Sequence, residues 1–245
     1  MQPITIVTGG SRGIGAATAR LCGAYGHAVC IAYRSETARA EEIAAAIVAD
    51  GGKAVAVQVD TADEAGIVRL FETVDRDLGR VTGLVNNAGI HGPRGRLENL
   101  SASDIDAVLR VNVAGYFLCA REAVKRMSTR QGGIGGSIVN VSSGSANNGS
   151  PNEGILYAAS KGAVNSLTIG LAQEVAKDGI RVNTVSPGLT SPGMPPAEKV
   201  AELAPRLPMG RAGRPEEIAE AICWLLSDKA SYTSAANLRV GGGRP

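Results

Sequence analysis

Short apolar runs rich in β-branched residues alternate along the chain with longer, alanine-rich stretches. The short runs predict buried strands, and the longer stretches predict helices. The expected strands are Ile4–Thr8, Ala28–Ala32, Ala54–Val59, Leu84–Asn86, Ser137–Val141, Arg181–Val185 and Leu238–Val240. The expected helices are Gly13–Tyr25, Thr37–Ala49, Asp63–Leu78, Ala102–Met127, Tyr157–Lys177 and Glu216–Leu226.

The alternation of strand and helix determines the expected architecture. Continuous apolar strands separated by helices pair in parallel through right-handed crossovers. We therefore expect an α/β fold with one doubly wound, Rossmann-type sheet of seven parallel strands and helices on both faces. At 245 residues with 44% hydrophobic content, the chain is expected to form a single domain, residues 1–245. Ligands of such folds bind at the carboxyl ends of the strands.

The segment between the sixth strand and the last helix departs from this alternation. Too many prolines lie there for one long helix, namely Pro192, Pro195, Pro196, Pro205 and Pro208. We expect a loop with short helical pieces, and residues 189–212 are a candidate substrate lid.

Charge and composition argue against several classes of function. The net charge is +2, from 25 basic and 23 acidic residues without long runs of one sign, which argues against nucleic acid as a partner. Apolar runs are too short for a membrane span, and the N-terminus lacks a signal-peptide pattern, so we expect a soluble, cytoplasmic protein.

The cysteines and histidines give no pattern of metal ligands. The cysteines have neither CxxC spacing nor histidines nearby, which predicts buried free thiols and fits a reducing cytoplasm. The two histidines lie near no other group of ligands, so no metal site is expected. These residues are Cys22, Cys30, Cys119, Cys223, His27 and His91.

A glycine-rich run lies between the first predicted strand and the first predicted helix. It reads Thr8-Gly9-Gly10-Ser11-Arg12-Gly13-Ile14-Gly15. Glycine suits this place because the backbone must turn sharply and let a pyrophosphate reach amide groups at the positive end of the helix. The run predicts a dinucleotide site, with a merely structural turn as the alternative. The residues expected to bind there are Gly9, Ser11, Arg12, Gly13, Ile14 and Gly15.

The end of the second strand indicates which dinucleotide binds. In this kind of fold an acidic residue there would bind the ribose 2′-hydroxyl of NAD, whereas a basic residue suits a 2′-phosphate. The chain reads Tyr33-Arg34-Ser35, and Arg12 of the glycine-rich run can approach from the other side. A guanidinium pairs with phosphate through two hydrogen bonds, so NADP(H) is the predicted cofactor. If both arginines are ordinary surface residues, NAD is the alternative.

Tyr157 and Lys161 form the strongest candidate for catalysis. Residues i and i+4 lie on one face of a helix, so the Lys161 ammonium is expected beside the Tyr157 phenol. A tyrosine pKa of about 10 must fall for proton transfer near neutral pH, and a nearby lysine lowers it. An ordinary surface pair is the alternative. The context favours catalysis, because the strand at residues 137–141 leads directly into Ser142 and Ser143.

Several motifs along the chain, and the order in which they occur, resemble those of the short-chain dehydrogenase/reductase family. The resemblance rests on TGxxxGxG at Thr8–Gly15, NNAG at residues 86–89 and YxxxK at Tyr157–Lys161, and it extends from Thr8 to Gly243. Residues 211–217 and 240–243 are similar to the β-ketoacyl carrier-protein reductase and glucose/ribitol-dehydrogenase-like branches.

The resemblance implies roles for the remaining strand ends. Tyr33 takes the place of the usual acidic residue, and Asp60 and Thr61 would contact the adenine, although Asp60 could equally cap a helix. Adjacent asparagines are costly to bury without hydrogen bonds, so a turn role also fits those of the NNAG run. The other implied cofactor residues are Asn87, Ala88 and Gly89 beside the adenosine and Pro187, Gly188 and Thr190 beside the nicotinamide, with Thr190 facing the carboxamide.

The resemblance also implies a catalytic tetrad, made of Asn112, Ser143, Tyr157 and Lys161. In carbonyl reduction the hydride of NADPH attacks the carbonyl carbon while Tyr157 protonates the oxygen that Ser143 positions. Lys161 would hold the nicotinamide ribose hydroxyls and lower the tyrosine pKa, and Asn112 would support a proton relay. Ser142 is the alternative serine, and Asn112 could instead cap backbone groups within its helix.

The expected activity is reversible, NADP(H)-dependent hydride transfer to a small-molecule carbonyl or from an alcohol. The alternatives are an NAD-linked sugar or polyol dehydrogenase and a non-catalytic NADP-sensing protein; the intact tetrad argues against the second. The resemblance implies a homotetramer, or alternatively a dimer, with helices 102–127 and 157–177 pairing between subunits. The chain departs from the family at two positions: it has Gly241 where the family often has an acidic residue, and Ser234 where the family often has glycine. We expect both departures to affect packing or subunit contacts.

Overall fold

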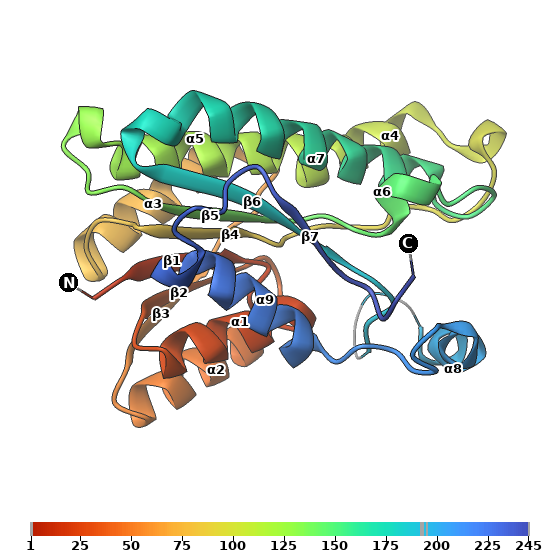
Figure 1. Cartoon of the computed structure of the whole chain (residues 1–245), viewed down its shortest axis with the longest axis horizontal. Coiled ribbons are helices and arrows are strands. Elements are labelled where there is room, and N and C mark those ends of the chain that lie inside the picture. Colours follow the sequence, from red (N-terminus) through yellow and green to blue (C-terminus); the bar gives the residue numbers. More distant parts are fainter. Residues whose placement is uncertain (1, 192–193, 195, 245) are drawn as a thin grey trace.

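A single parallel sheet runs through the centre of the computed structural model, which describes residues 2–191, 194 and 196–244 (Figure 1). Within those residues the sheet has seven strands in the order β3-β2-β1-β4-β5-β6-β7, and all neighbours pair in parallel. This arrangement confirms the predicted fold class. The strands are β1 Ile4–Thr8, β2 Ala28–Tyr33, β3 Lys53–Gln58, β4 Gly83–Asn86, β5 Gly136–Val141, β6 Ile180–Pro187 and β7 Asn237–Val240.

Helices cover both faces of the sheet (Figure 1). One face carries α1 Gly13–Ala24, α2 Thr37–Ala49 and α9 Pro215–Leu226; the other carries α3 Glu64–Asp77, α4 Ala102–Leu109, α5 Gly115–Met127 and α7 Ile155–Val175. Successive strand residues point to opposite faces, so Ile6 packs with one helix layer and Val7 with the other. Burial of both strand faces explains the continuous apolar runs of the sequence.

The helix predicted at Ala102–Met127 is not a continuous α-helix. A π-helical turn, Arg110–Ala114, separates α4 from α5. The turn holds Asn112, whose side chain bonds to backbone outside its own helix, and such turns are frequent at functional sites. Gly115 follows the turn directly, but a single glycine is tolerated within a helix, so propensity alone does not predict the interruption.

Other helix boundaries shift by a few residues. The helix predicted at Tyr157–Lys177 begins earlier, at Ile155, and ends at Val175, followed by the 3₁₀ turn Ala176–Asp178. A short helix that the sequence did not predict, α6 Ser145–Asn148, follows β5.

The segment predicted as a loop with short helical pieces contains α8 Ala197–Leu203 and the 3₁₀ turn Ala204–Arg206. Both of its ends are held together, because Thr190 and Gly213 form an isolated parallel bridge. The Ser191 amide donates to the Gly213 carbonyl at 2.9 Å. Pro192, Gly193 and Pro195 of this segment lie outside the described residues.

All four cysteines are buried as free thiols. The sulfur atoms of Cys22 in α1 and Cys223 in α9 lie 3.6 Å apart. This contact joins α1, which follows the glycine-rich turn, to α9. The hydrogen bond with Cys223 and burial hold the pKa of the Cys22 thiol well above its ordinary value, so the thiol form dominates. Across the described part of the chain, no helix is both long enough and apolar enough to cross a bilayer.

Candidate functional site

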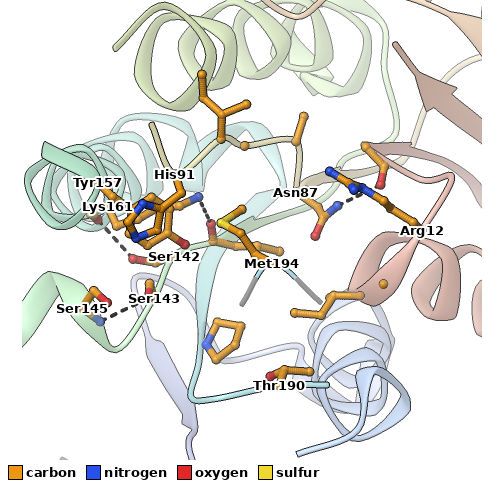
Figure 2. Close-up of a pocket in the computed structure, with 18 of the residues that line it drawn as sticks. Arg12, Asn87, His91, Ser142, Ser143, Ser145, Tyr157, Lys161, Thr190 and Met194 are labelled. Carbon is orange, nitrogen blue, oxygen red and sulfur yellow. Dashed lines mark hydrogen bonds between the residues drawn. The ribbon is translucent and has the colours of Figure 1, made fainter. Parts of the chain in front are cut away.

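A cleft of roughly 1140 Å³ lies at the carboxyl ends of the strands. Residues that follow β1 to β6 line it, as expected for a doubly wound sheet. Among the predicted site residues, Gly15 and Asn112 do not line the cleft, and both lie directly behind it. Figure 2 shows Arg12 and Asn87 at one end of the cleft; at the other end lie Tyr157, Lys161, His91, Ser142, Ser143 and Ser145.

The glycine-rich turn brings backbone amides to the cleft. Gly9 and Gly13 have φ angles of 63° and 53°, which favour glycine. A Cβ atom at Gly15 would lie 2.3 Å from the Gly9 carbonyl oxygen, so the turn closes onto α1 only with glycine there. Within the described residues no side chain caps α1, and no acidic residue lies in its first turn. The first amides of α1 are therefore available to an anion such as a pyrophosphate, which is a fit between this chain and a dinucleotide.

Thr8 and Asn87 hold this turn against the end of β4. The Thr8 hydroxyl accepts hydrogen bonds from the Asn87 amide at 2.9 Å and the Ala88 amide at 3.1 Å. The Asn87 side-chain amide donates to the Thr8 carbonyl at 2.9 Å and the Gly9 carbonyl at 3.2 Å. Asn87 therefore has the turn role that the sequence left open, while it also lines the cleft.

The end of the cleft beside β2 is basic. Arg12, Tyr33, Arg34 and Ser35 all line it, as predicted from the missing carboxylate after β2. One carboxylate was overlooked: Glu36 lines the same cleft and lies 3.5 Å from Arg39. Because Arg39 neutralises it, the local balance stays positive.

Asp60 and Thr61 line the cleft beside this basic end. The Asp60 carboxylate accepts from the Ala62 amide at 2.9 Å. It does not cap α3, whose N-cap is Asp63. The capping alternative for Asp60 is therefore wrong, and its carboxylate fixes a local turn at the cleft wall.

Lys161 lies on α7 with its ammonium group buried behind Tyr157. Its Nζ donates to the Val141 carbonyl at 2.7 Å and to the Tyr116 hydroxyl at 3.0 Å. Nζ also lies 5.9 Å from the centroid of the Tyr157 ring, as the i, i+4 spacing predicts. Burial lowers the pKa of Lys161 to about 7, because the charged form loses its hydration.

Burial acts on Tyr157 in the same way and raises its pKa, while a hydrogen bond with Ser143 lowers it. The expected fall of the tyrosine pKa beside Lys161 is therefore not produced by the protein alone. Both groups are removed from water, and each favours its neutral form. Additional polar contacts to Lys161 would be needed to keep the lysine charged and the phenol acidic.

Ser142 and Ser143 differ in what their hydroxyls contact. The buried Ser142 hydroxyl donates to the Lys161 carbonyl at 3.1 Å and so joins the end of β5 to α7. The Ser143 hydroxyl accepts from the Ser145 amide at 3.1 Å (Figure 2), and it lies close enough to Tyr157 to lower the pKa of that phenol. The α6 turn thus orients Ser143 toward the phenol, and the geometry favours Ser143 as the substrate-facing serine.

Asn112 holds the chain that follows the NNAG run. Its side chain donates to the Ile90 carbonyl at 2.8 Å and accepts from the Ile90 amide at 2.8 Å, and it also donates to the Ser160 hydroxyl at 3.0 Å. A Cβ atom at Gly89 would lie 3.3 Å from the Asn112 Oδ1 and 3.6 Å from the Lys161 Nζ. Glycine at position 89 thus leaves space between Asn112 and Lys161.

Two aromatic residues of the site were not identified from the sequence. The His91 ring stacks on the Tyr157 ring, with centroids 5.0 Å apart and an interplanar angle of 16°. Tyr116 of α5 is fully buried and donates its hydroxyl to the Val141 carbonyl at 3.0 Å while accepting from Lys161. Only His91 had a weak signal in the sequence, because it lies just after the NNAG run. Tyr116 is indistinguishable from a core residue in a helix.

The Pro187–Gly188 turn after β6 packs against the end of β7. The Gly188 amide donates to the Val240 carbonyl at 2.9 Å, and a Cβ atom at Gly188 would lie 2.7 Å from the Gly241 Cα. Thr190 lines the cleft and donates to the Gly188 carbonyl at 3.1 Å. Gly241 therefore lies in a close backbone contact, and Ser234 accepts from the Val182 amide at 3.2 Å. Both residues have packing contacts, as expected.

Comparisons with known proteins identify the family of the chain. The model of the family described as "Enoyl-(Acyl carrier protein) reductase" matches residues 9–244. The chain is 48% identical to YgfF, an uncharacterized oxidoreductase of Escherichia coli strain K12, over 98% of this chain and 99% of that protein.

Solved structures show the same relationship. A short-chain dehydrogenase/reductase from Serratia marcescens BCRC 10948 superposes with a TM-score of 0.92 at 34% identity, covering 98% of this chain and 97% of that one. A short-chain dehydrogenase from Burkholderia cenocepacia J2315 in complex with NADP gives a TM-score of 0.91 at 35% identity, covering 99% and 97%. The fold, the cleft and these relatives define an oxidoreductase. The chain belongs to the short-chain dehydrogenase/reductase family.

Proposed function

We propose that the protein is an NADP(H)-dependent oxidoreductase that interconverts a carbonyl and an alcohol on a small molecule. The observation that carries this proposal is the continuity of one cleft from the uncapped start of α1 to the Tyr157–Lys161 pair. A dinucleotide whose pyrophosphate lies at α1 can extend along this cleft toward the tyrosine. A purely NADP-sensing protein would not need a phenol, a lysine and a serine gathered at the far end.

The residues of the tetrad have distinct roles in this proposal. The bound nicotinamide supplies or accepts the hydride. Tyr157 exchanges the proton with the substrate oxygen, and Ser143 donates a hydrogen bond to that oxygen. Lys161 is held by Val141 and Tyr116. In this proposal it binds the hydroxyls of the nicotinamide ribose, and in its charged form it stabilises the Tyr157 phenolate. Asn112 positions the backbone at Ile90 and borders the space at Gly89.

Arg34 and Arg12 support NADP(H) over NAD(H), and the bound NADP of the Burkholderia relative agrees with this choice. Replacing Arg34 with alanine is expected to weaken NADPH binding about 10- to 100-fold, because one charge-assisted phosphate contact is lost. NADH has no 2′-phosphate, so its affinity should change little. Fluorescence titration of both nucleotides against the wild-type protein and the variant measures this difference.

Arg76→Ala is the matched control, since Arg76 is exposed on α3 and pairs with Asp77 away from the cleft. The phosphate assignment fails if the wild-type protein binds NADH more tightly than NADPH. That result would favour the NAD-linked alternative, with Glu36 as the acidic residue near the ribose.

The assembly is proposed to be a homotetramer, with a dimer as the alternative. Phe117 of α5 and Ile169 of α7, two helices on the same face of the sheet, are each 51% exposed. Covering such side chains with a second copy would remove apolar area from water. We expect Phe117→Asp to produce a smaller species in light scattering after size-exclusion chromatography, while Val48→Asp on α2, in the opposite helix layer, serves as the control. An unchanged mass in Phe117→Asp would contradict this interface.

We also propose that the whole chain forms one catalytic domain, with residues 189–212 as a substrate lid. The bridge between Thr190 and Gly213 would serve as its base. The cytoplasm is the proposed compartment, supported by the four buried thiols.

A further inference from the structure

Three charged side chains from separate segments meet at the substrate end of the cleft. Arg94 belongs to the loop after β4, Glu153 to the loop before α7, and Lys199 to α8 of the proposed lid. Arg94 and Lys199 both donate to the same carboxylate oxygen of Glu153, Oε1. One carboxylate thus bridges a cation on the body of the protein and a cation on the lid.

This group lies next to the catalytic tyrosine. His91 stacks on Tyr157 (Figure 2), and all three charged residues line the same cleft as that pair. Burial lowers the pKa of His91, and the positive charges of Arg94 and Lys199 lower it further. A Cβ atom at Gly154, the neighbour of Glu153, would lie 2.9 Å from the His91 ring, so the charged group lies beside the residue that stacks on the phenol.

The charges in this part of the cleft do not cancel. Arg94 and Lys199 share a single carboxylate, which leaves one positive charge in excess. Glu202 also lines this end, but it pairs with Arg206 at 3.7 Å. Arg239 and Arg244 also line the cleft and add positive charge. An anionic ligand would therefore be attracted to this end of the cleft.

We propose that the substrate carries a carboxylate, which binds between Arg94 and Lys199, in addition to the carbonyl or alcohol that reacts at Tyr157. Glu153 shows that a carboxylate fits both cations, and it occupies their donors when the substrate is absent. The substrate carboxylate takes over these donors and joins the lid to the body of the protein. This inference rests on the proposed function, because it names the substrate class of the same site.

The first test compares keto acids with their neutral counterparts. Linear keto acids with increasing numbers of methylene groups between ketone and carboxylate are each paired with the corresponding amide, and NADPH consumption gives KM and kcat. For the keto acid whose chain length fits the site best, we expect a KM about 10-fold or more below that of the corresponding amide. A difference of this size is expected when one charge pair forms away from water. Equal KM values at every length would overturn the inference.

Variants assign this preference to the residues. Arg94→Gln and Lys199→Gln are each expected to bring the KM ratio of amide to acid toward one. Glu153→Gln is expected to increase the ratio, because it removes the carboxylate that competes with the substrate. Arg211→Gln is the matched control: it removes a lid cation that, like its partner Glu217, lies outside the cleft lining, and it should leave the ratio unchanged. A ratio that responds to Arg211 as strongly as to Arg94 would overturn the assignment.

A binding experiment separates this inference from the proposed function. Calorimetry of cyclohexanecarboxylate and cyclohexanecarboxamide with the wild-type protein and Arg94→Gln requires no turnover. Tighter binding of the acid that is lost in Arg94→Gln supports the carboxylate site, even if every ketone is inert and the proposed reaction fails. Turnover of ketones with no preference for the acid in either experiment refutes the carboxylate site alone.

Discussion

Replacing Tyr157 with phenylalanine is expected to reduce hydride transfer about 10³-fold, because general acid catalysis by a positioned group contributes about 10²- to 10⁴-fold. The variant keeps the half-buried ring that stacks on His91, and it should therefore fold and still bind NADPH. Only the hydroxyl that exchanges the proton is lost. NADPH absorbance with a ketone substrate measures the rate, and nucleotide fluorescence measures the binding.

Tyr25→Phe is the matched control for this experiment. Tyr25 is exposed at the end of α1, and its hydroxyl donates to Glu220 at 3.0 Å, away from the cleft lining. Its removal should leave the rate unchanged. Substantial turnover by Tyr157→Phe, with intact turnover by Tyr25→Phe, would refute the role assigned to Tyr157.

Much of the fold and most of the cleft-lining residues could be predicted because their physical signals are local. A buried parallel strand must be apolar on both faces, so β1, β2 and β5 are readable as continuous apolar runs. The close approach at Gly15 tolerates only glycine, and the i, i+4 spacing alone places Lys161 behind Tyr157.

The rest depended on contacts between distant segments. The π turn at Arg110–Ala114 contains Asn112, which bonds to Ile90 22 residues earlier. The Tyr116 hydroxyl reaches Lys161 across 45 residues, and no spacing rule connects them. Glu36 lies three positions after Tyr33, which takes the place of the usual acidic residue, yet the start of α2 turns Glu36 into the cleft. Such features follow from packing, which a single sequence does not encode in any local pattern.

The burial of Lys161 has a consequence for stability that differs from its role in catalysis. Its pKa is about 7 in the folded protein and 10.5 for an ordinary lysine, so the unfolded chain binds more protons between these values. The free energy of unfolding should therefore rise with pH through this window, by an amount on the order of 5 kcal/mol if no other group compensates. Below pH 7 the cost of burying the charge is present in full.

Lys161→Met is expected to lose most activity and yet to be more stable than the wild-type protein near and below neutral pH. Methionine fills similar space without a charge to desolvate. The stability difference should shrink as the pH rises from about 7 toward 10.5, because the wild-type lysine then becomes neutral in the unfolded chain as well. Urea unfolding of the apoprotein across this range measures the difference.

Lys177→Met, at an exposed position just after α7, is the matched control and should show no such trend. A constant difference between Lys161→Met and wild type at every pH would show that Lys161 is charged throughout, held by Val141 and Tyr116 strongly enough to offset its burial.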